Sequence, residues 1–182
     1  MTHRSLTRPT ASRSRHLLVA LAISCLAAPV AAQPELEAIN VASPLPGITT
    51  SGQISEGDLE TIAGAGYVAV INLRSAEENG NWDARPRAEE LGLAYHTIPI
   101  AGAGEVTPEA AAQLDQLLLE LGASPERPVL VHCASSNRVG ALFALREAAS
   151  GADREAALEL GRAAGLRSLE GRVEEILAAD PD

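Results

Sequence analysis

The stretch Val129-Leu130-Val131-His132-Cys133-Ala134-Ser135-Ser136-Asn137-Arg138-Val139-Gly140 joins an apolar run, a loop of small polar residues and the start of a helix. The apolar run predicts a buried strand. In α/β proteins, ligands bind at the carboxyl ends of such strands, where the next helix offers unpaired N–H groups to anions. A cysteine at that point is stabilised as the thiolate, which is the nucleophilic form. We therefore predict that Cys133 is a nucleophile and that Arg138 binds an oxyanion above it.

The other residues of this loop are expected to support anion binding. They are small, so backbone amides can face inward, and several side chains can donate hydrogen bonds. His132 precedes the cysteine and either orients the loop or is an ordinary buried histidine. The predicted substrate-binding residues of the loop are His132, Ala134, Ser135, Ser136 and Asn137.

Strands and helices alternate on both sides of this loop. Apolar or β-branched runs predict strands over residues 48–54, 67–73, 93–100 and 129–131. Capping residues and helical spacing predict helices that begin after Ser55, Thr107, Asp153 and Ser168, a short one at 87–91 and one at 139–149. This order predicts an α/β fold with a mainly parallel central sheet flanked by helices, in a single domain spanning residues 47–182.

The N-terminus has the pattern of a secretory signal. Residues 1–16 are basic and free of acidic residues, residues 17–30 are apolar, and Val30-Ala31-Ala32 is a small-residue cleavage pattern. We predict a signal peptide at 1–32, a linker at 33–46 and a periplasmic or secreted location. Cys25 leaves a lipoprotein alternative open, although apolar residues continue beyond it. After cleavage near Gln33, Cys133 is the sole cysteine of the chain.

Composition restricts the class of partner. Hydrophobic residues make up 46% of the 182 residues, which is enough for a packed core. Without residues 1–32, ten arginines face 24 acidic residues and the formal net charge is −14. This charge disfavours nucleic-acid binding, and we expect no membrane association after signal removal. No cluster has metal-ligand spacing, so we expect no metal and no cofactor. The expected partner is a small phosphate- or sulfur-bearing anion, or a phosphoprotein.

Several stretches resemble the cysteine-dependent phosphatases. They are Ser51–Ile54, Val70–Arg74, Tyr95–Ile100 and His132-Cys133 through Arg138. The nearest resemblance is to the bacterial beta-lactamase hydrolase-like family of phosphatases or sulfurtransferases. It implies the tyrosine and dual-specificity phosphatase fold over roughly residues 41–180 and a phosphocysteine intermediate at Cys133.

The resemblance has three departures in the loop. Tyrosine phosphatases place five residues between cysteine and arginine, whereas this chain has four. Ser136 stands where the family usually has glycine, so a positive φ there would strain it. Val139 replaces the hydroxyl residue that eases release of phosphate from the cysteine. The shorter loop also suits a sulfurtransferase with a Cys133 persulfide, and a non-catalytic anion-binding module remains a further alternative.

The general acid is the main gap in the resemblance. A phosphatase protonates the leaving oxygen, and by analogy the acid lies in the loop after Ile100. That loop has no aspartate, so Glu105 is the candidate there and Asp83 is the alternative. Each is otherwise an ordinary surface carboxylate. Arg74 follows a buried strand, so it either holds an anion beside the pocket or lies on the surface.

Overall fold

The computed structural model describes Met1 and residues 34–80 and 82–179. The predicted signal peptide, apart from Met1, lies outside the described residues. The strands are β1 (Ala42–Leu45), β2 (Ile48–Ser51), β3 (Ala69–Asn72), β4 (Ala94–Thr97) and β5 (Val129–His132). The helices are α1 (Glu56–Gly64), α2 (Ala76–Asn79), α3 (Arg85–Glu90), α4 (Pro108–Leu121), α5 (Asn137–Ala149), α6 (Arg154–Ala163) and α7 (Glu170–Ala179), with a 3₁₀ turn, η1, at Ala103–Glu105.

The five strands form one sheet in the order β1-β2-β5-β3-β4. All neighbours are parallel except β1 and β2, which are antiparallel. The strand β5 lies at the centre, with Ser51 of β2 and Asn72 of β3 beside its last residue, His132. The carboxyl ends of three parallel strands therefore meet where Cys133 follows β5. The predicted mainly parallel α/β fold is confirmed.

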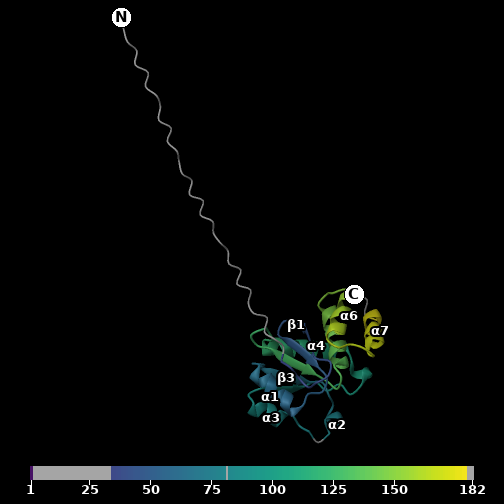
Figure 1. Cartoon of the computed structure of the whole chain (residues 1–182). Coiled ribbons are helices and arrows are strands. Elements are labelled where there is room, and N and C mark those ends of the chain that lie inside the picture. Colours follow the sequence, from purple (N-terminus) through teal and green to yellow (C-terminus); the bar gives the residue numbers. More distant parts are fainter. Residues whose placement is uncertain (2–33, 81, 180–182) are drawn as a thin grey trace. The chain divides into compact units, whose positions relative to one another are not determined.

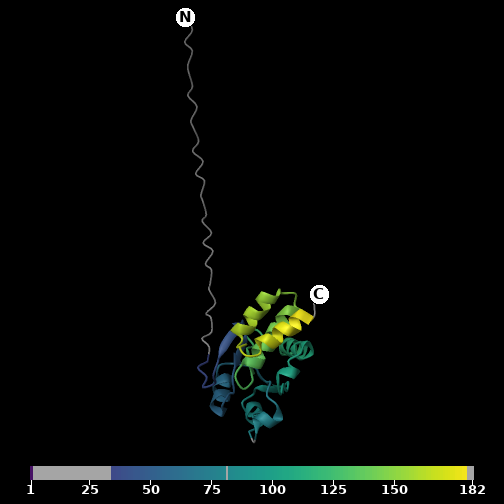
Figure 2. The same cartoon turned by 90° about the vertical axis from the view of Figure 1, so that its right-hand side faces the viewer.

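Helices cover both faces of the sheet. On one face, α1 and α3 pack with Leu59, Ile62 and Ala88 against Val70 and Leu130. The larger core on the other face lies beneath α4 to α7 and includes the fully buried Phe143. In Figures 1 and 2, α1 and α3 lie on the opposite side of the sheet from α6 and α7. The chemistry-bearing loop is thus built on a strand that is buried on both faces.

The helix ends follow the sequence signals. Ser55 and Asp58 form a reciprocal capping box at α1. Thr107 caps α4, Pro108 is its first residue, and Gly122 ends it in the left-handed conformation at φ 63°. Both helices begin and end within one or two residues of the bounds that these signals predict.

One prediction about local structure is wrong, and one element was not predicted. The predicted linker at 33–46 contains β1, and before it the Ile39 carbonyl accepts the Gly52 N–H at 2.7 Å. The prolines and weak periodicity of this stretch did not indicate a strand, and β1 forms at the edge of the sheet by pairing with β2. The helix α2 was not predicted either, because a single turn carries no helical periodicity.

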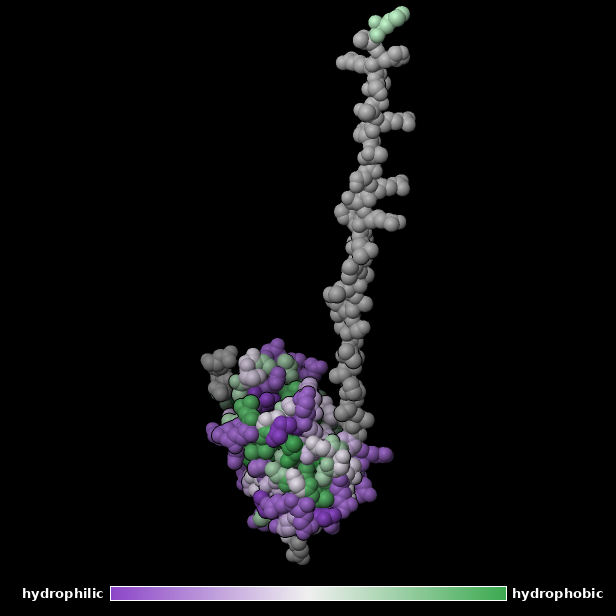
Figure 3. Space-filling view, turned by 90° about the vertical axis from the view of Figure 1, so that its left-hand side faces the viewer, coloured by the Kyte–Doolittle hydropathy of each residue, from purple (hydrophilic) through white to green (hydrophobic). Residues whose placement is uncertain are grey.

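One face of the domain shows how polar and apolar residues are distributed. In the face shown in Figure 3, hydrophilic residues surround a smaller central group of hydrophobic ones. Among the described helices, none is long and apolar enough to cross a membrane. The residues that the structure describes contain no group of three or more His, Cys, Asp or Glu side chains placed to hold a metal ion.

Candidate active site

Cys133 lies between the end of β5 and the start of α5. It is a free, fully buried thiol, and its N–H donates to the Ser51 carbonyl at 3.3 Å. Ser136 is the N-cap residue of α5, so the first turn of that helix begins three residues after the cysteine. The unpaired amides and the positive dipole end of α5 stabilise negative charge at this point. The structure therefore places a buried thiol at the N-terminus of a helix.

Neighbouring segments hold the outer side of the loop. The carbonyl of Ala134 accepts the Gln53 N–H at 3.1 Å, and the carbonyl of Ser135 accepts the Asn40 side-chain amide at 3.0 Å. In a trans peptide, the carbonyl and the following N–H point in opposite directions. The Ser135 N–H consequently points away from Gln53, and the Ser136 N–H points away from Asn40.

The side chains at the helix end of the loop have hydrogen-bond partners within the protein. The Ser136 hydroxyl donates to the Ala164 carbonyl at 2.9 Å. The Asn137 amide donates to the Ser168 hydroxyl at 2.8 Å, and its oxygen accepts the Arg167 N–H at 2.7 Å. Both side chains hold the connection between α6 and α7, and their role in substrate binding stays a prediction.

Ser136 adopts the left-handed conformation anticipated for a position that the family fills with glycine. Its φ is 65°. The facing residue is Gly165, where an added Cβ would lie only 2.5 Å from the Ser136 Cβ. The glycine at 165 thus makes room for the serine at 136, whose hydroxyl bond offsets part of the backbone strain.

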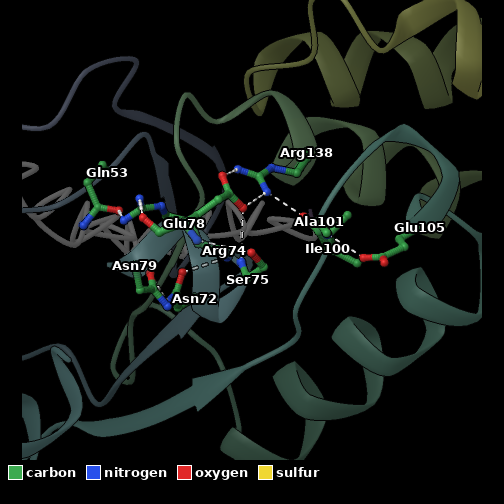
Figure 4. Close-up of polar contacts among 10 residues, drawn as sticks. All are labelled: Gln53, Asn72, Arg74, Ser75, Glu78, Asn79, Ile100, Ala101, Glu105 and Arg138. Atoms are coloured by element: carbon green, nitrogen blue, oxygen red, sulfur yellow. Dashed lines mark hydrogen bonds and ion pairs between the residues drawn. The ribbon is translucent and has the colours of Figure 1, made fainter. Parts of the chain in front are cut away.

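Arg138 is held by three hydrogen bonds, which Figure 4 shows. Its Nη1 donates to Glu78 Oε2 and to the Ile100 carbonyl, each at 2.5 Å, and its Nη2 donates to Glu78 Oε1 at 2.6 Å. The Arg138 side chain is 11% exposed. Within the part of the chain that the structure describes, three of its five N–H groups have oxygen acceptors, which leaves the Nε–H and one Nη2–H. Those two form a parallel edge that matches two oxygens of an oxyanion.

Charge completes this arrangement. Hydrogen bonding to Glu78 and the nearby Cys133 sulfur both raise the pKa of Arg138, so its guanidinium is charged throughout. Hydrogen bonds from Arg138, above all, hold the pKa of Glu78 below its ordinary value of 4.5. Glu78 is therefore a carboxylate at neutral pH, and it cannot serve as a general acid there.

Glu78 is the functional residue that the sequence analysis missed. It is the third residue of α2, and Ser75 and Glu78 form a reciprocal capping box. The Ser-x-x-Glu pattern at 75–78 directly after a buried strand was the available signal. It predicts a helix start, but it does not say that the same carboxylate reaches Arg138, 60 residues away in the chain.

Arg74 does not point a free guanidinium into the site. Its Nη1 donates to Gln53 Oε1 and its Nη2 donates to the Glu78 carbonyl (Figure 4). Its backbone N–H donates to Asn72 Oδ1 at 2.8 Å. Both terminal nitrogens thus have a protein acceptor, and direct anion binding by Arg74 stays a prediction.

The two candidate acids lie in different places. Glu105 Oε2 accepts the Ala101 N–H at 2.5 Å, and the same peptide group gives its Ile100 carbonyl to Arg138. Asp83 Oδ1 accepts the Arg85 N–H at 3.0 Å at the start of α3. The structure therefore connects Glu105 to Arg138 through one peptide, whereas this contact of Asp83 is local to α3.

His132 is enclosed beside the nucleophile. It is fully buried, and neither ring nitrogen has a hydrogen-bond partner among the described residues. Burial lowers its pKa to about 4, and the positive charges of Arg74 and Arg138 act in the same direction. The ring is consequently neutral at physiological pH, which suits a packing or orienting role and excludes a cationic one.

A separate groove of about 470 Å³ runs along the outer edge of the sheet between β4 and α4. It contains none of the predicted site residues. Its lining comprises Arg85, Tyr95, His96, Thr97, Ile98, Gln113, Gln116, Leu117 and Glu120.

Comparison with known proteins agrees with this geometry. A family model described as the beta-lactamase hydrolase-like protein, phosphatase-like domain, matches residues 43–150. This chain belongs to that family. Beta-lactamase hydrolase-like proteins from two strains of Xylella fastidiosa are 36% identical to it over 124 residues, which is 65% of this chain. The match spans only 28% of the length of those relatives.

Solved structures show the same fold. A candidate phosphatase from Neisseria meningitidis superimposes with a TM-score of 0.62 at 25% identity, over 76% of this chain and 97% of that one. A cysteine-to-serine variant of TpbA from P. aeruginosa, in complex with pTyr, gives a TM-score of 0.58 at 21% identity, over 83% of this chain and 90% of that one. This family member therefore has the fold of cysteine-dependent phosphatases.

Proposed function

We propose that this protein is a cysteine-dependent phosphatase that hydrolyses phosphomonoesters through a phosphocysteine at Cys133. The observation that carries the proposal is the state of Arg138. The residue is fixed by Glu78 and Ile100, and among the described residues its other two N–H groups have no oxygen acceptor, so they form an edge suited to an oxyanion. A buried thiol at a helix N-terminus beside such an arginine is suited to attack on phosphorus.

The reaction has two steps. The Cys133 thiolate attacks phosphorus, an S–P bond forms, and the O–P bond to the leaving group breaks. Arg138 and the loop amides stabilise the charge that develops on the phosphoryl oxygens. Water then attacks the phosphocysteine, which releases inorganic phosphate and restores the thiolate.

Aryl phosphates are the proposed substrate class. A phenolic leaving group carries negative charge better than an aliphatic alkoxide, so it depends less on a general acid. This matters because Glu105 is occupied by its own loop and Glu78 is held ionised. The complex of TpbA with pTyr shows that this fold accommodates such a group in that protein. We expect hydrolysis of phosphotyrosine to exceed that of phosphoserine.

A sulfurtransferase is the second candidate. Four residues separate Cys133 from Arg138, and a persulfide at Cys133 would need no general acid. That mechanism would use the same thiolate and the same amides.

A paired assay separates the two functions. One arm follows hydrolysis of 4-nitrophenyl phosphate, and the other follows sulfur transfer from thiosulfate to cyanide, with Cys133→Ser as control in both. Phosphate release that depends on Cys133 supports the phosphatase. Thiocyanate formation without phosphate release would replace it with the sulfurtransferase, and activity that survives Cys133→Ser would refute both mechanisms.

A further inference from the structure

We propose that Arg74 is a positioning residue that fixes α2 so that Glu78 presents its carboxylate to Arg138. It therefore controls oxyanion binding without touching the oxyanion. The inference rests on the proposed function, since its effect is on the anion site of that reaction.

Arg74 bridges two segments that flank the site. One terminal nitrogen donates to Gln53, which follows β2, and the other donates to the main-chain carbonyl of Glu78. The arginine itself is anchored through its backbone N–H on Asn72, a buried residue at the end of β3. The sheet thus fixes Arg74, and Arg74 fixes α2 (Figure 4).

The helix α2 needs this support because it is a single turn of four residues. A turn of that length is unstable by itself, and its last carbonyls have no partner within the helix. The Ser75 capping box holds its start. The Arg74 guanidinium satisfies the Glu78 carbonyl at its end. Glu78 is consequently held by its main chain on Arg74 and by its carboxylate on Arg138.

Electrostatics supports the same assignment. The positive charges of both arginines lower the pKa of Glu78, with Arg138 the larger cause. One carboxylate therefore lies between two guanidinium groups. Two of the five Arg74 N–H groups donate to Gln53 and Glu78, and the Nε–H is buried without a partner among the described residues. Direct contact of Arg74 with the oxyanion is the alternative role, and a double-mutant cycle distinguishes the two.

A double-mutant cycle tests the inference. Arg74→Met keeps much of the apolar stem, Glu78→Gln removes the carboxylate charge, and the double variant carries both. The readouts are calorimetric binding of orthovanadate and kcat and KM for 4-nitrophenyl phosphate. Arg154→Met is the matched control, since it removes an exposed arginine at the start of α6.

The single variants are each expected to weaken orthovanadate binding by about tenfold or more, and Arg154→Met to leave it unchanged. If Arg74 acts through Glu78, the double variant binds within about threefold of Glu78→Gln alone. Gln53→Ala, which removes one partner of Arg74, is expected to give a smaller loss in the same direction. If circular dichroism shows that Arg74→Met is unfolded, Arg74→Lys replaces it in the cycle.

Two results would overturn the inference. Multiplied losses in the double variant would mean that Arg74 binds the anion independently of Glu78, and unchanged binding in Arg74→Met would mean that it has no role. Either result, with orthovanadate binding intact in the wild-type protein, leaves the proposed function standing. A wild-type protein that neither binds orthovanadate nor hydrolyses the ester would overturn the proposed function and this inference together.

Discussion

Glu78 and Glu105 approach Arg138 from two different segments, and they differ in what holds them. Glu78 is 30% exposed and makes a two-point ion pair with the guanidinium. Glu105 is exposed and acts at one remove, by accepting the N–H of the peptide whose carbonyl meets Arg138. The first contact fixes both the charge and the orientation of the arginine, whereas the second fixes only a loop. A short distance from Arg138 is therefore not by itself evidence that a carboxylate is the general acid.

The largest effect is expected when Arg138 is replaced, because its contacts to Glu78 and to the Ile100 carbonyl are then lost together. Arg138→Lys keeps the charge but loses the fork that binds Glu78, Ile100 and an oxyanion at once. Because such donors stabilise the transition state, kcat/KM should fall by about 10²–10³-fold. Hydrolysis of 4-nitrophenyl phosphate measures this. A lysine variant as active as wild type would show that a simple positive charge suffices.

Removal of the Glu78 carboxylate is expected to give the next largest effect, which is a loss of stability that depends on pH. The pKa of Glu78 is lowered in the folded state from 4.5. The ion pair therefore stabilises the fold fully above about pH 4.5, and this contribution is lost as pH falls through the lowered pKa. Glu78→Gln should reduce the denaturation midpoint clearly at about pH 7 and much less at about pH 3.

Chemical denaturation of both proteins at the two pH values measures this difference, with Glu159→Gln, an exposed glutamate in α6, as a control for charge removal. An equal loss of stability at both pH values would contradict the ionic origin of the Glu78 contribution.

The Glu105 side is expected to give a smaller loss. Glu105→Gln retains an oxygen that can accept the Ala101 N–H, so the loop keeps its position and kcat/KM should fall by less than about fivefold. The shape of the pH–rate profile sharpens the comparison. Loss of the decline at high pH in this variant would identify Glu105 as the general acid, and would contradict its assignment as a loop support.

The smallest effect is expected at Ser136, which touches neither glutamate. Glycine relieves a left-handed backbone worth about 1 kcal/mol, while loss of the hydroxyl bond to Ala164 costs about 1 kcal/mol. The free energy of unfolding of Ser136→Gly should thus lie within about 1 kcal/mol of wild type. A larger loss by urea denaturation would show that the contact between Ser136 and Gly165 contributes more than these two opposing effects.

The sequence predicted the parts of this molecule that depend on local signals. Ser55 and Thr107 marked helix starts, and the run before Cys133 marked the central strand, because capping and apolar runs are read within a few residues. It did not predict the partners of Arg138, because Glu78 and Ile100 are 60 and 38 residues away. Nor could it show that Asn137 holds a distant turn, since the composition of the loop is the same whether or not it does.

The most direct test of the account is to trap the covalent intermediate. Val139 provides no hydroxyl next to Arg138 to help release phosphate, so hydrolysis of the phosphocysteine should be slow and the intermediate should accumulate. Rapid acid quench during turnover of 4-nitrophenyl phosphate, followed by peptide mass spectrometry, locates the phosphoryl group. The account predicts a phosphoryl group on Cys133 and none in Cys133→Ser. Sustained turnover by Cys133→Ser, with no phosphoryl group on the wild-type cysteine, would contradict it.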